Sequence, residues 1–437
     1  MKIPLFKSKD IVLFILLTTI IFSGCSMFIL NLDETSNDST TTASSNENSE
    51  TTTSLTDSML IIIEHSLYSS IKSSVDTYIE DLSSEDIDCI IATWTSTDVV
   101  ELKDLLKSYS GVIESAFLIG DLPAAWYEQT AFNKEETFPT DLYFMDTDSV
   151  WSDSDENGYF DYHSDLHIDI YTSRLTGTAD EVNFYFNKLH NYRTNSGETP
   201  VYDNAFIFKD DDWQDNYKNN YFGLDSIYSS VDYYQTTLNT TRASYENKLT
   251  QTGVEYVFQW IHAYPTALFV DEGDNYNLIK TEDIATSSFN ANFYNLFDCK
   301  AARFTVDNVA ESYINQTESC IAIMGSTKAG GVYYPVEFHK AIAAGYSWGE
   351  AYKKWYNNIG CEDDSWYLGI VIMGDPTIHP YHATGTNLSK SSRSISDIIP
   401  LSKSEKEKLY NKFIDFETSE VLPEEIRATL EKNNITY

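Results

Sequence analysis

The pattern of hydrophobic and polar positions alternates, from residue 58 onwards, between short apolar runs and longer amphipathic segments. The run SMLIIIEHSLY (58–68) is apolar and β-branched, which is typical of a buried strand. The segment IKSSVDTYIEDL (71–82) instead repeats its apolar residues at helical spacing. Further strands are expected at 86–95 and 113–121, with a helix at 98–110 between them. Strands that alternate with helices of this length predict an α/β fold with mainly parallel sheets flanked by helices.

A second series of apolar runs begins near residue 204, so the sequence predicts two α/β subdomains. The runs expected to form its strands include NAFIFKDDDW (204–213), EYVFQWIHA (255–263) and ANFYNLFDC (291–299). We expect a signal peptide at 1–24 and a tether at 25–57. These are followed by a first subdomain at 58–200, a second, catalytic subdomain at 201–381 and a charged helical appendage at 382–437.

The N-terminus carries the features of an export signal. Three lysines precede the apolar run IVLFILLTTIIF (11–22), which has the length of a signal peptide rather than of a membrane span. The run leads into FSGC (22–25), which is similar to a bacterial lipoprotein signal, with Phe22 where leucine is usual. We expect a lipid on Cys25 and an extracytoplasmic protein anchored to a bacterial membrane. Ordinary secretion and a short membrane anchor are the alternatives.

Composition narrows the classes of partner. Residues 25–57 are rich in Ser, Thr, Asn and acidic side chains, so they cannot bury enough apolar surface to fold and are expected to form a flexible tether. The formal net charge of the chain is −38 at pH 7. The resulting negative electrostatic potential excludes nucleic acid as a partner and favours basic peptides and divalent cations. The alternative is that the charge only keeps the protein soluble. Four cysteines beyond Cys25 are too few for a disulfide framework in so long an exported chain.

Two chemically active side chains stand at the ends of predicted strands. His262 ends the run EYVFQWIHA, and Cys299 follows the next strand of the same subdomain. A thiol beside an imidazole is the smallest set of side chains that can perform nucleophilic catalysis by cysteine. The alternative is that both side chains only pack, as buried cysteines often do. Asp211 or Asp212, after the strand at 204–209, could orient the imidazole, or they could simply cap a loop.

Five segments of the second subdomain resemble, in order, the catalytic region of gingipain-like cysteine peptidases, which have a caspase-like α/β fold. They are YVFQWIHA (256–263), NLFDCKAARF (295–304), AIMGSTKAGG (322–331), GEAYKKWY (349–356) and GIVIMGDPTI (369–378). The resemblance extends over residues 58–381. It implies that Cys299 is the nucleophile, that His262 is the acid and base, and that the backbone N–H groups of Cys299 and Ala263 hold the oxyanion. Protein or peptide substrates follow from the same resemblance.

Two residues depart from the family pattern. Ala263 stands where glycine is usual, which would strain the backbone if this position needs a positive φ. Asp298 stands where a small apolar residue is usual, and a carboxylate beside the thiol would oppose thiolate formation. A catalytically inactive lipoprotein that acts as a surface binding or scaffolding module is therefore the alternative function. A calcium-dependent adhesin is a third.

An acidic loop in the first subdomain has the spacing of a calcium-binding loop. Its candidate ligands at alternate positions are Asp153, Asp155, Asn157, Tyr159 through its carbonyl, and Asp161. Gly158 permits the sharp turn, whereas position 12 is Ser164 in place of the usual glutamate. Another aspartate would have to complete the shell, with Asp146, Asp148 and Asp165 as candidates. We expect calcium here in a structural role, against the alternative of a merely acidic turn.

Overall fold

The structure is a computed structural model that describes residues 29–30, 58–131, 134–197, 199, 201–273, 276–380, 402, 404–406 and 408–409. The predicted signal peptide, Cys25, nearly all of the predicted tether and most of the predicted C-terminal appendage lie outside these residues. Among the described residues, no helix combines the length and the apolar character that crossing a bilayer requires.

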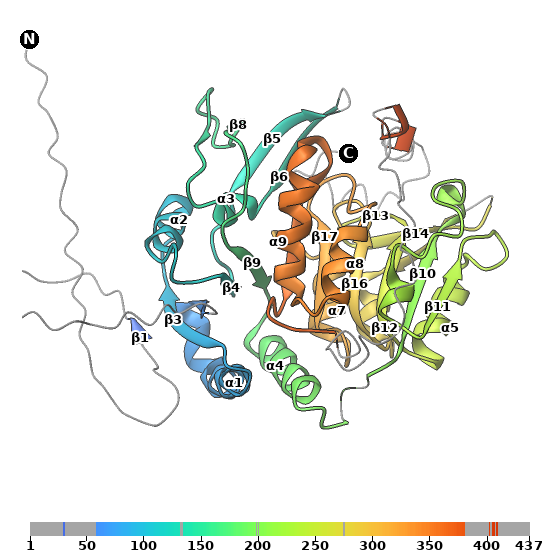
Figure 1. Cartoon of the computed structure of the whole chain (residues 1–437), viewed down its shortest axis with the longest axis horizontal. Helices are drawn as coiled ribbons and strands as arrows, with labels where there is room; N and C mark the ends of the chain where they lie inside the picture. Colours follow the sequence, from blue (N-terminus) through green and yellow to red (C-terminus); the bar gives the residue numbers. More distant parts are fainter. Residues whose placement is uncertain are drawn as a thin grey trace, which may run out of the picture.

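One sheet of eleven strands runs through the described part of the chain (Figure 1). Neighbouring strands are parallel within each half of the sheet, in the orders β1-β3-β2-β4-β9 and β17-β16-β12-β10-β11. Strand β18 lies between the halves, antiparallel to β17 and joined to β9 through the single pair Met373↔Arg174. The bounds in sheet order are Ile29–Leu30, Asp88–Trp94, Ser58–Glu64, Ser115–Ile119, Tyr171–Leu175, Ile370–Gly374, Ala322–Ser326, Ala291–Phe297, Val254–Trp260, Asn204–Lys209 and Ser230–Tyr234. The predicted α/β class is confirmed.

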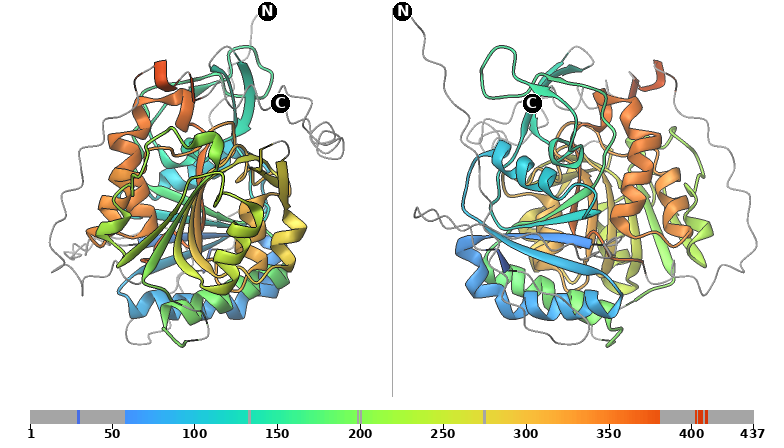
Figure 2. Two further views of the ribbon diagram at one scale, coloured as in Figure 1. Left: turned by 90° about the vertical axis from the view of Figure 1, so that its right-hand side faces the viewer. Right: turned by 60° about the vertical axis from the view of Figure 1, so that its left-hand side comes forward.

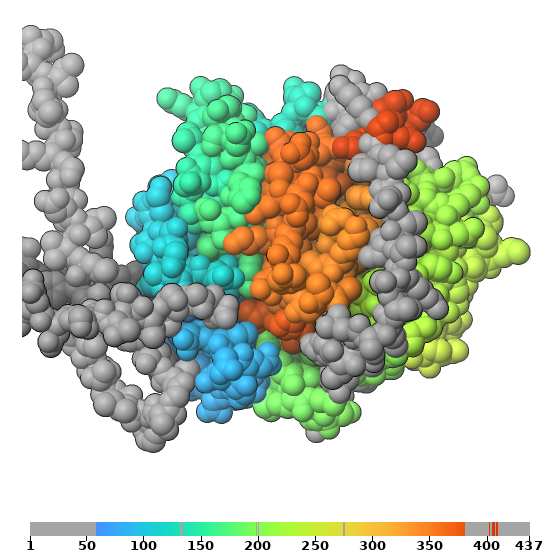
Figure 3. Space-filling model, viewed as in Figure 1, coloured from blue at the N-terminus to red at the C-terminus, as the bar shows by residue number. Residues whose placement is uncertain are grey.

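Helices cover both faces of this sheet (Figure 2). On strand β16 the ring of Phe293 stacks on Trp348 of α9 at 5.1 Å, whereas the next residue, Tyr294, stacks on Tyr313 of α7 at 4.3 Å. Since neighbouring residues of a strand point to opposite faces, both faces of β16 are buried, and all seven of its residues are buried. Helices α8 and α9 form the middle of the face seen in Figure 3.

The two segments expected to be helical, 71–82 and 98–110, correspond to helices α1 and α2. The bounds of the helices, from α1 to α10, are His65–Ser84, Val99–Ser108, Leu142–Met145, Ala179–Arg193, Arg242–Gln251, Thr281–Thr286, Val309–Gln316, Val336–Ala343, Trp348–Asn358 and Asp364–Tyr367. Short 3₁₀ helices lie at Asp211–Trp213 (η1), Leu224–Ser226 (η2) and Gly360–Glu362 (η3).

Small antiparallel elements were not predicted. Strands β5 (Trp126–Ala131) and β6 (Lys134–Pro139) form a hairpin, β7 (Trp151–Ser152) pairs with β8 (Tyr162–His163), and a third small sheet contains β13 (His262–Tyr264), β14 (Ala267–Asp271) and β15 (Tyr276–Lys280). The expected strand at 255–263 is therefore two strands. Strand β12 ends at Trp260, and His262 already belongs to β13.

Candidate active site

Parallel strands β10, β12 and β16 are neighbours, so their carboxyl ends lie at one edge of the sheet, where sites of α/β proteins form. The last paired residues of β12 and β16 are Trp260 and Phe297. His262 and Cys299 each stand two residues beyond this pair. The register of the sheet thus brings the predicted histidine and cysteine to equivalent positions on adjacent strands.

His262 is held by an aspartate and by aromatic rings. The imidazole is 3% exposed, and its Nε2 lies 3.3 Å from Oδ2 of Asp212. The ring of Trp213 packs against it with centroids 4.8 Å apart. Tyr276 donates its hydroxyl hydrogen to the same Asp212 oxygen at 3.2 Å. The imidazole therefore has a fixed orientation, with a carboxylate placed to stabilise its protonated form.

Of the two candidates for orienting the imidazole, Asp212 and not Asp211 is paired with His262. The chain turns into the 3₁₀ helix Asp211–Trp213 directly after β10, and this turn points Asp212 and Trp213 at the imidazole. Asp211, like Asp212, lies near Asp271, whose pKa is raised to about 6 by burial and by the carboxylates of Asp212 and Asp211. Consecutive aspartates cannot be told apart from sequence when the turn that separates them is not predicted.

Cys299 is enclosed in the resting structure. It is 3% exposed, and its Sγ accepts a hydrogen bond from the Gly330 N–H at 3.2 Å. Burial raises the pKa of the thiol to about 12, although the Gly330 N–H and Lys300 oppose the rise. Cys299 is therefore a protonated thiol at neutral pH, and it could act as a nucleophile only if a base removed this proton. Cys89, Cys320 and Cys361, the other described cysteines, are also free thiols.

Gly330 belongs to a loop that only glycines can bring so close to the nucleophile. Its φ is +106°, and a Cβ there would lie 2.9 Å from the ring of Trp366. A Cβ on Gly331 would lie 2.8 Å from the backbone of Phe297. The Gly-Gly pair of the segment AIMGSTKAGG is thus explained by the close approach of Gly330 to Trp366 of α10 and of Gly331 to β16. The role of Gly330 was not foreseen, although the pair is visible in the sequence.

The strain expected at Ala263 does not arise. Ala263 lies in β13, paired with Leu268, and it is not among the described residues with positive φ. The left-handed position is Lys300, directly after the nucleophile, with φ 59°. Its N–H donates to the Lys328 carbonyl at 2.9 Å, which fixes the turn that follows Cys299.

Asp298 does not act as expected either. Its carboxylate faces β12, where one oxygen accepts from the Ile261 N–H at 2.9 Å and the other from Gln259 Nε2 at 2.5 Å. Besides burial and the Gly330 N–H, the largest influences on the pKa of Cys299 come from Lys300, Glu136 and Lys328. Burial also raises the pKa of Asp298 itself well above its usual value. The carboxylate is therefore directed to the neighbouring strand and not at the thiol.

The hairpin β5–β6 brings the first half of the chain to the nucleophile loop. Glu136 of β6 is 4% exposed, accepts a hydrogen bond from the Ala329 N–H at 2.9 Å and lies 3.4 Å from Nζ of Lys328. The Arg303 guanidinium donates to the Thr137 carbonyl at 3.1 Å. These contacts fix the loop whose next residue, Gly330, bonds to Cys299. No sequence pattern identified Glu136, because its partners lie far away in the chain.

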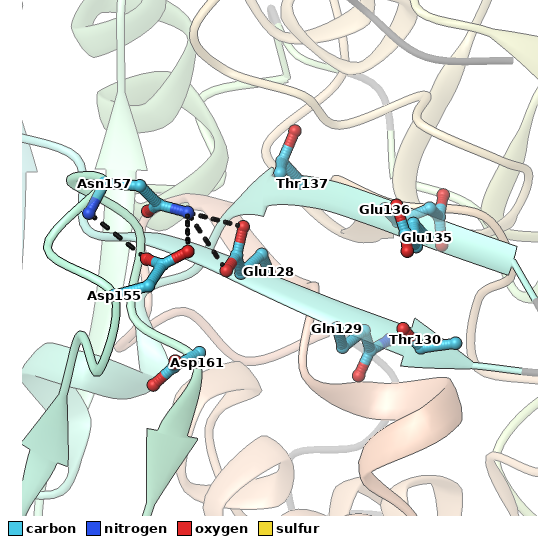
Figure 4. A pocket seen from close by; sticks show the side chains of 9 residues that line it. All are labelled: Glu128, Gln129, Thr130, Glu135, Glu136, Thr137, Asp155, Asn157 and Asp161. Carbon is cyan, nitrogen blue, oxygen red and sulfur yellow. Dashed lines mark hydrogen bonds between the residues drawn. The ribbon is translucent and has the colours of Figure 1, made fainter.

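The acidic loop brings together only part of the expected ligand set. Carboxylate oxygens of Asp155, Asp161 and Glu128 lie within 4.8 Å of one another, beside a cavity of about 570 Å³. Figure 4 shows Asn157 bonded to Asp155 and to Glu128, which comes from β5. The Asp153 carboxylate instead accepts hydrogen bonds from the N–H groups of Asn157 and Gly158. Three hard oxygen donors at this spacing suit calcium, so the residues present fit the ion.

The remaining aspartates do not complete this shell. Asp146 and Asp148 form a separate cluster with Asp169. Tyr159 donates its N–H to the side chain of Asn157. Glu128, from the unpredicted hairpin, is the carboxylate of this cluster that the loop pattern alone could not supply.

Comparison with known proteins agrees with this geometry. The profile of peptidase family C25 matches residues 52–381. Among solved structures, the chain is similar to the Arg-specific cysteine proteinase gingipain R, with a TM-score of 0.55 at 12% identity over 75% of this chain and 78% of that one. At this identity the likeness shows the fold, which confirms the gingipain-like architecture. No curated protein matches the chain. Because the profile covers most of its length, the chain belongs to peptidase family C25, the gingipain family.

Proposed function

We propose that the protein is a cysteine endopeptidase that hydrolyses peptide bonds through Cys299 and His262 outside the cytoplasm. One observation carries the proposal: His262 and Cys299 stand at equivalent positions beyond the paired ends of two adjacent parallel strands. Asp212 at His262 Nε2 supplies the third group that a catalytic imidazole needs.

In the proposed reaction each of these groups has a role. With Nε2 facing Asp212, Nδ1 of His262 takes the proton from the Cys299 thiol as sulfur bonds to the substrate carbonyl carbon. The N–H groups of Cys299 and Ala263 hold the oxyanion. His262 then protonates the leaving amine, the C–N bond breaks, and a thioester remains. Water, deprotonated by His262, hydrolyses the thioester and regenerates the thiol.

Cleavage of a broad peptide library tests this function. We expect new termini within the peptides, detected by mass spectrometry, and inhibition by thiol-reactive peptidyl inhibitors but not by serine-directed phosphonofluoridates, since the nucleophile is sulfur. No cleavage across the library would contradict the proposal.

A second function is favoured by the enclosure of the thiol. Cys299 is 3% exposed and burial raises its pKa to about 12. Such a thiol would be inert if no movement admitted substrate, and the protein would then be a surface binding or scaffolding lipoprotein. The library result separates the two functions.

We further propose that Asp155, Asp161 and Glu128 bind calcium in a structural role. Excess calcium should raise the melting temperature, because a ligand that binds only the folded state increases the free energy of unfolding. At a calcium concentration of 100 times Kd the increase is about 2.7 kcal/mol, which raises the melting temperature by roughly 5 °C. Asp155→Asn should remove most of this increment, as measured by thermal unfolding in calcium and in chelator. Asp165→Asn is the control, since it makes the same change of charge just beyond strand β8 and outside the cluster. Equal melting temperatures of the wild type in calcium and in chelator would contradict the site.

We also propose the lipid anchor at Cys25, supported by the FSGC sequence after a short apolar run. Cys25→Ser should leave no thiol to acylate, so the protein should leave the membrane fraction or remain unprocessed. Fractionation and the mobility of the protein measure this, with Cys361→Ser as the control. A Cys25→Ser variant that stays in the membrane with unchanged mobility would contradict the anchor.

A further inference from the structure

Asp298 occupies the position directly before Cys299, and its side chain joins the two strands that carry the catalytic pair. Its side chain is fully buried, at 0% exposure. The Ile261 N–H donates to one carboxylate oxygen at 2.9 Å, and Gln259 Nε2 donates to the other at 2.5 Å. Gln259 lies in β12 and Ile261 follows its end, so Asp298 bridges from the end of β16 to the end of β12.

This bridge begins where the pairing of the two strands stops. The last pair of β12 and β16 is Trp260 with Phe297. The next residues are Ile261 and Asp298, and the residues after those are His262 and Cys299. The bond between the Asp298 carboxylate and the Ile261 N–H therefore continues the connection of the strands to within one residue of both reacting side chains.

Further hydrogen bonds fix the orientation of the bridge. The Tyr245 hydroxyl, from α5, donates to Oε1 of Gln259 at 2.6 Å and lies 2.8 Å from the hydroxyl of Tyr313 in α7. The amide oxygen of Gln259 is thus engaged by Tyr245, which leaves its NH₂ group to face Asp298. All four side chains are buried, so a group of this network that loses its partner stays unsatisfied.

We propose that Asp298 is a positioning residue, which holds the backbone of Ile261 and His262 at the separation from Cys299 that proton transfer requires. The inference rests on the proposed peptidase function. In this proposal Asp298, which departs from the family pattern, supports catalysis by holding His262 in place and does not oppose the formation of the Cys299 thiolate.

The test compares two variants of Asp298. Asp298→Ala removes both acceptors, so His262 should lose its fixed place and kcat for peptide cleavage should fall about 10²-fold, as for a misplacement of about 1 Å. KM should change less than about threefold, because the substrate-binding surface is untouched. Asp298→Asn retains an acceptor for the Ile261 N–H, and its NH₂ can pair with Gln259 once that amide turns over. This variant should recover kcat to within about tenfold of the wild type.

Asn292→Ala is the matched control. Asn292 is equally buried near the other end of β16, where it donates to the Ser319 carbonyl at 3.0 Å. Its loss should lower the melting temperature but leave kcat within about threefold. The proposal is overturned if Asp298→Ala cleaves as fast as the wild type or faster. It is also overturned if kcat of Asp298→Asn is no higher than kcat of Asp298→Ala, or if Asn292→Ala lowers kcat as much as Asp298→Ala does.

A readout without catalysis separates this proposal from the peptidase function. Hydrogen exchange at the Ile261 amide should be slow in the wild type and in Asp298→Asn, and at least about tenfold faster in Asp298→Ala, because that variant removes the acceptor of this N–H. Equal exchange in all three overturns the positioning role even if the wild type cleaves peptides. A third outcome is that the exchange pattern is as expected but the wild type cleaves no peptide. This would overturn the peptidase function and the catalytic part of the proposal, while it would support the bond between the Ile261 N–H and Asp298.

Discussion

Replacement of Cys299 by alanine is expected to abolish peptide cleavage, lowering kcat by about 10³-fold or more, because no other group can form the thioester. The fold should persist, since removing one buried sulfur costs about 1 kcal/mol beside a core of this size. Cleavage rates and thermal unfolding of the two proteins provide the measurement.

Cys320→Ala is the control for this variant. Cys320 is equally buried and free, and burial raises its pKa to about 12 as well, but it lies before β17 and away from the strand ends that carry the site. We expect its cleavage rate to stay within about threefold of the wild type. Comparable losses in both variants would show that the effect of Cys299→Ala is structural.

Replacement of His262 by alanine should lower kcat by about 10²- to 10⁴-fold, the usual contribution of a general acid and base. The effect should be large here because burial keeps the Cys299 thiol protonated at neutral pH, so attack depends on a base. Asp212→Asn should lower kcat about ten- to 100-fold, since it removes the charge that stabilises the imidazolium. Initial rates at saturating peptide measure both effects.

Asp211→Asn is the matched control for Asp212→Asn. The two residues are adjacent in η1 and carry the same charge, but only Asp212 is paired with His262. We expect Asp211→Asn to keep kcat within about threefold of the wild type. A larger loss in Asp211→Asn than in Asp212→Asn would contradict the assignment.

The sequence was sufficient for the long elements and for placing two chemically active side chains, His262 and Cys299, at one edge of the sheet. Strands buried on both faces, such as β16, are continuous apolar runs, and the polar residues that follow them fall at one edge of a parallel sheet. His262 and Cys299 could be identified by this rule together with the resemblance to a family.

The supporting residues could not be predicted, because each depends on a local turn or on a distant segment. The choice of Asp212 over Asp211 is made by a three-residue 3₁₀ helix. Glu128 reaches the acidic loop, and Glu136 reaches the nucleophile loop, from a hairpin with no strong periodic signal. The bonding of Asp298 to Ile261 and Gln259 could not be predicted either, because these partners lie on and just after the neighbouring strand β12.

The resting environment of Cys299 also changes how its reactivity must be measured. A small alkylating reagent acts on exposed thiolate, and Cys361 is more exposed than Cys299. A reagent of this kind would report exposure and not catalytic function. A probe with a peptide portion is needed, because only binding at the site places its electrophile beside the thiol and His262.

Intact-mass and peptide-mapping analysis after treatment with a peptidyl chloromethyl ketone therefore tests the central claim most directly. The account predicts one adduct per chain, located at Cys299, with little adduct on Cys361, and none in Cys299→Ala. His262→Ala should slow the formation of the adduct, because the base that removes the thiol proton is gone. An adduct that persists in Cys299→Ala, or a wild-type protein whose Cys299 stays unmodified by a panel of such probes, would contradict the assignment of Cys299 as the nucleophile.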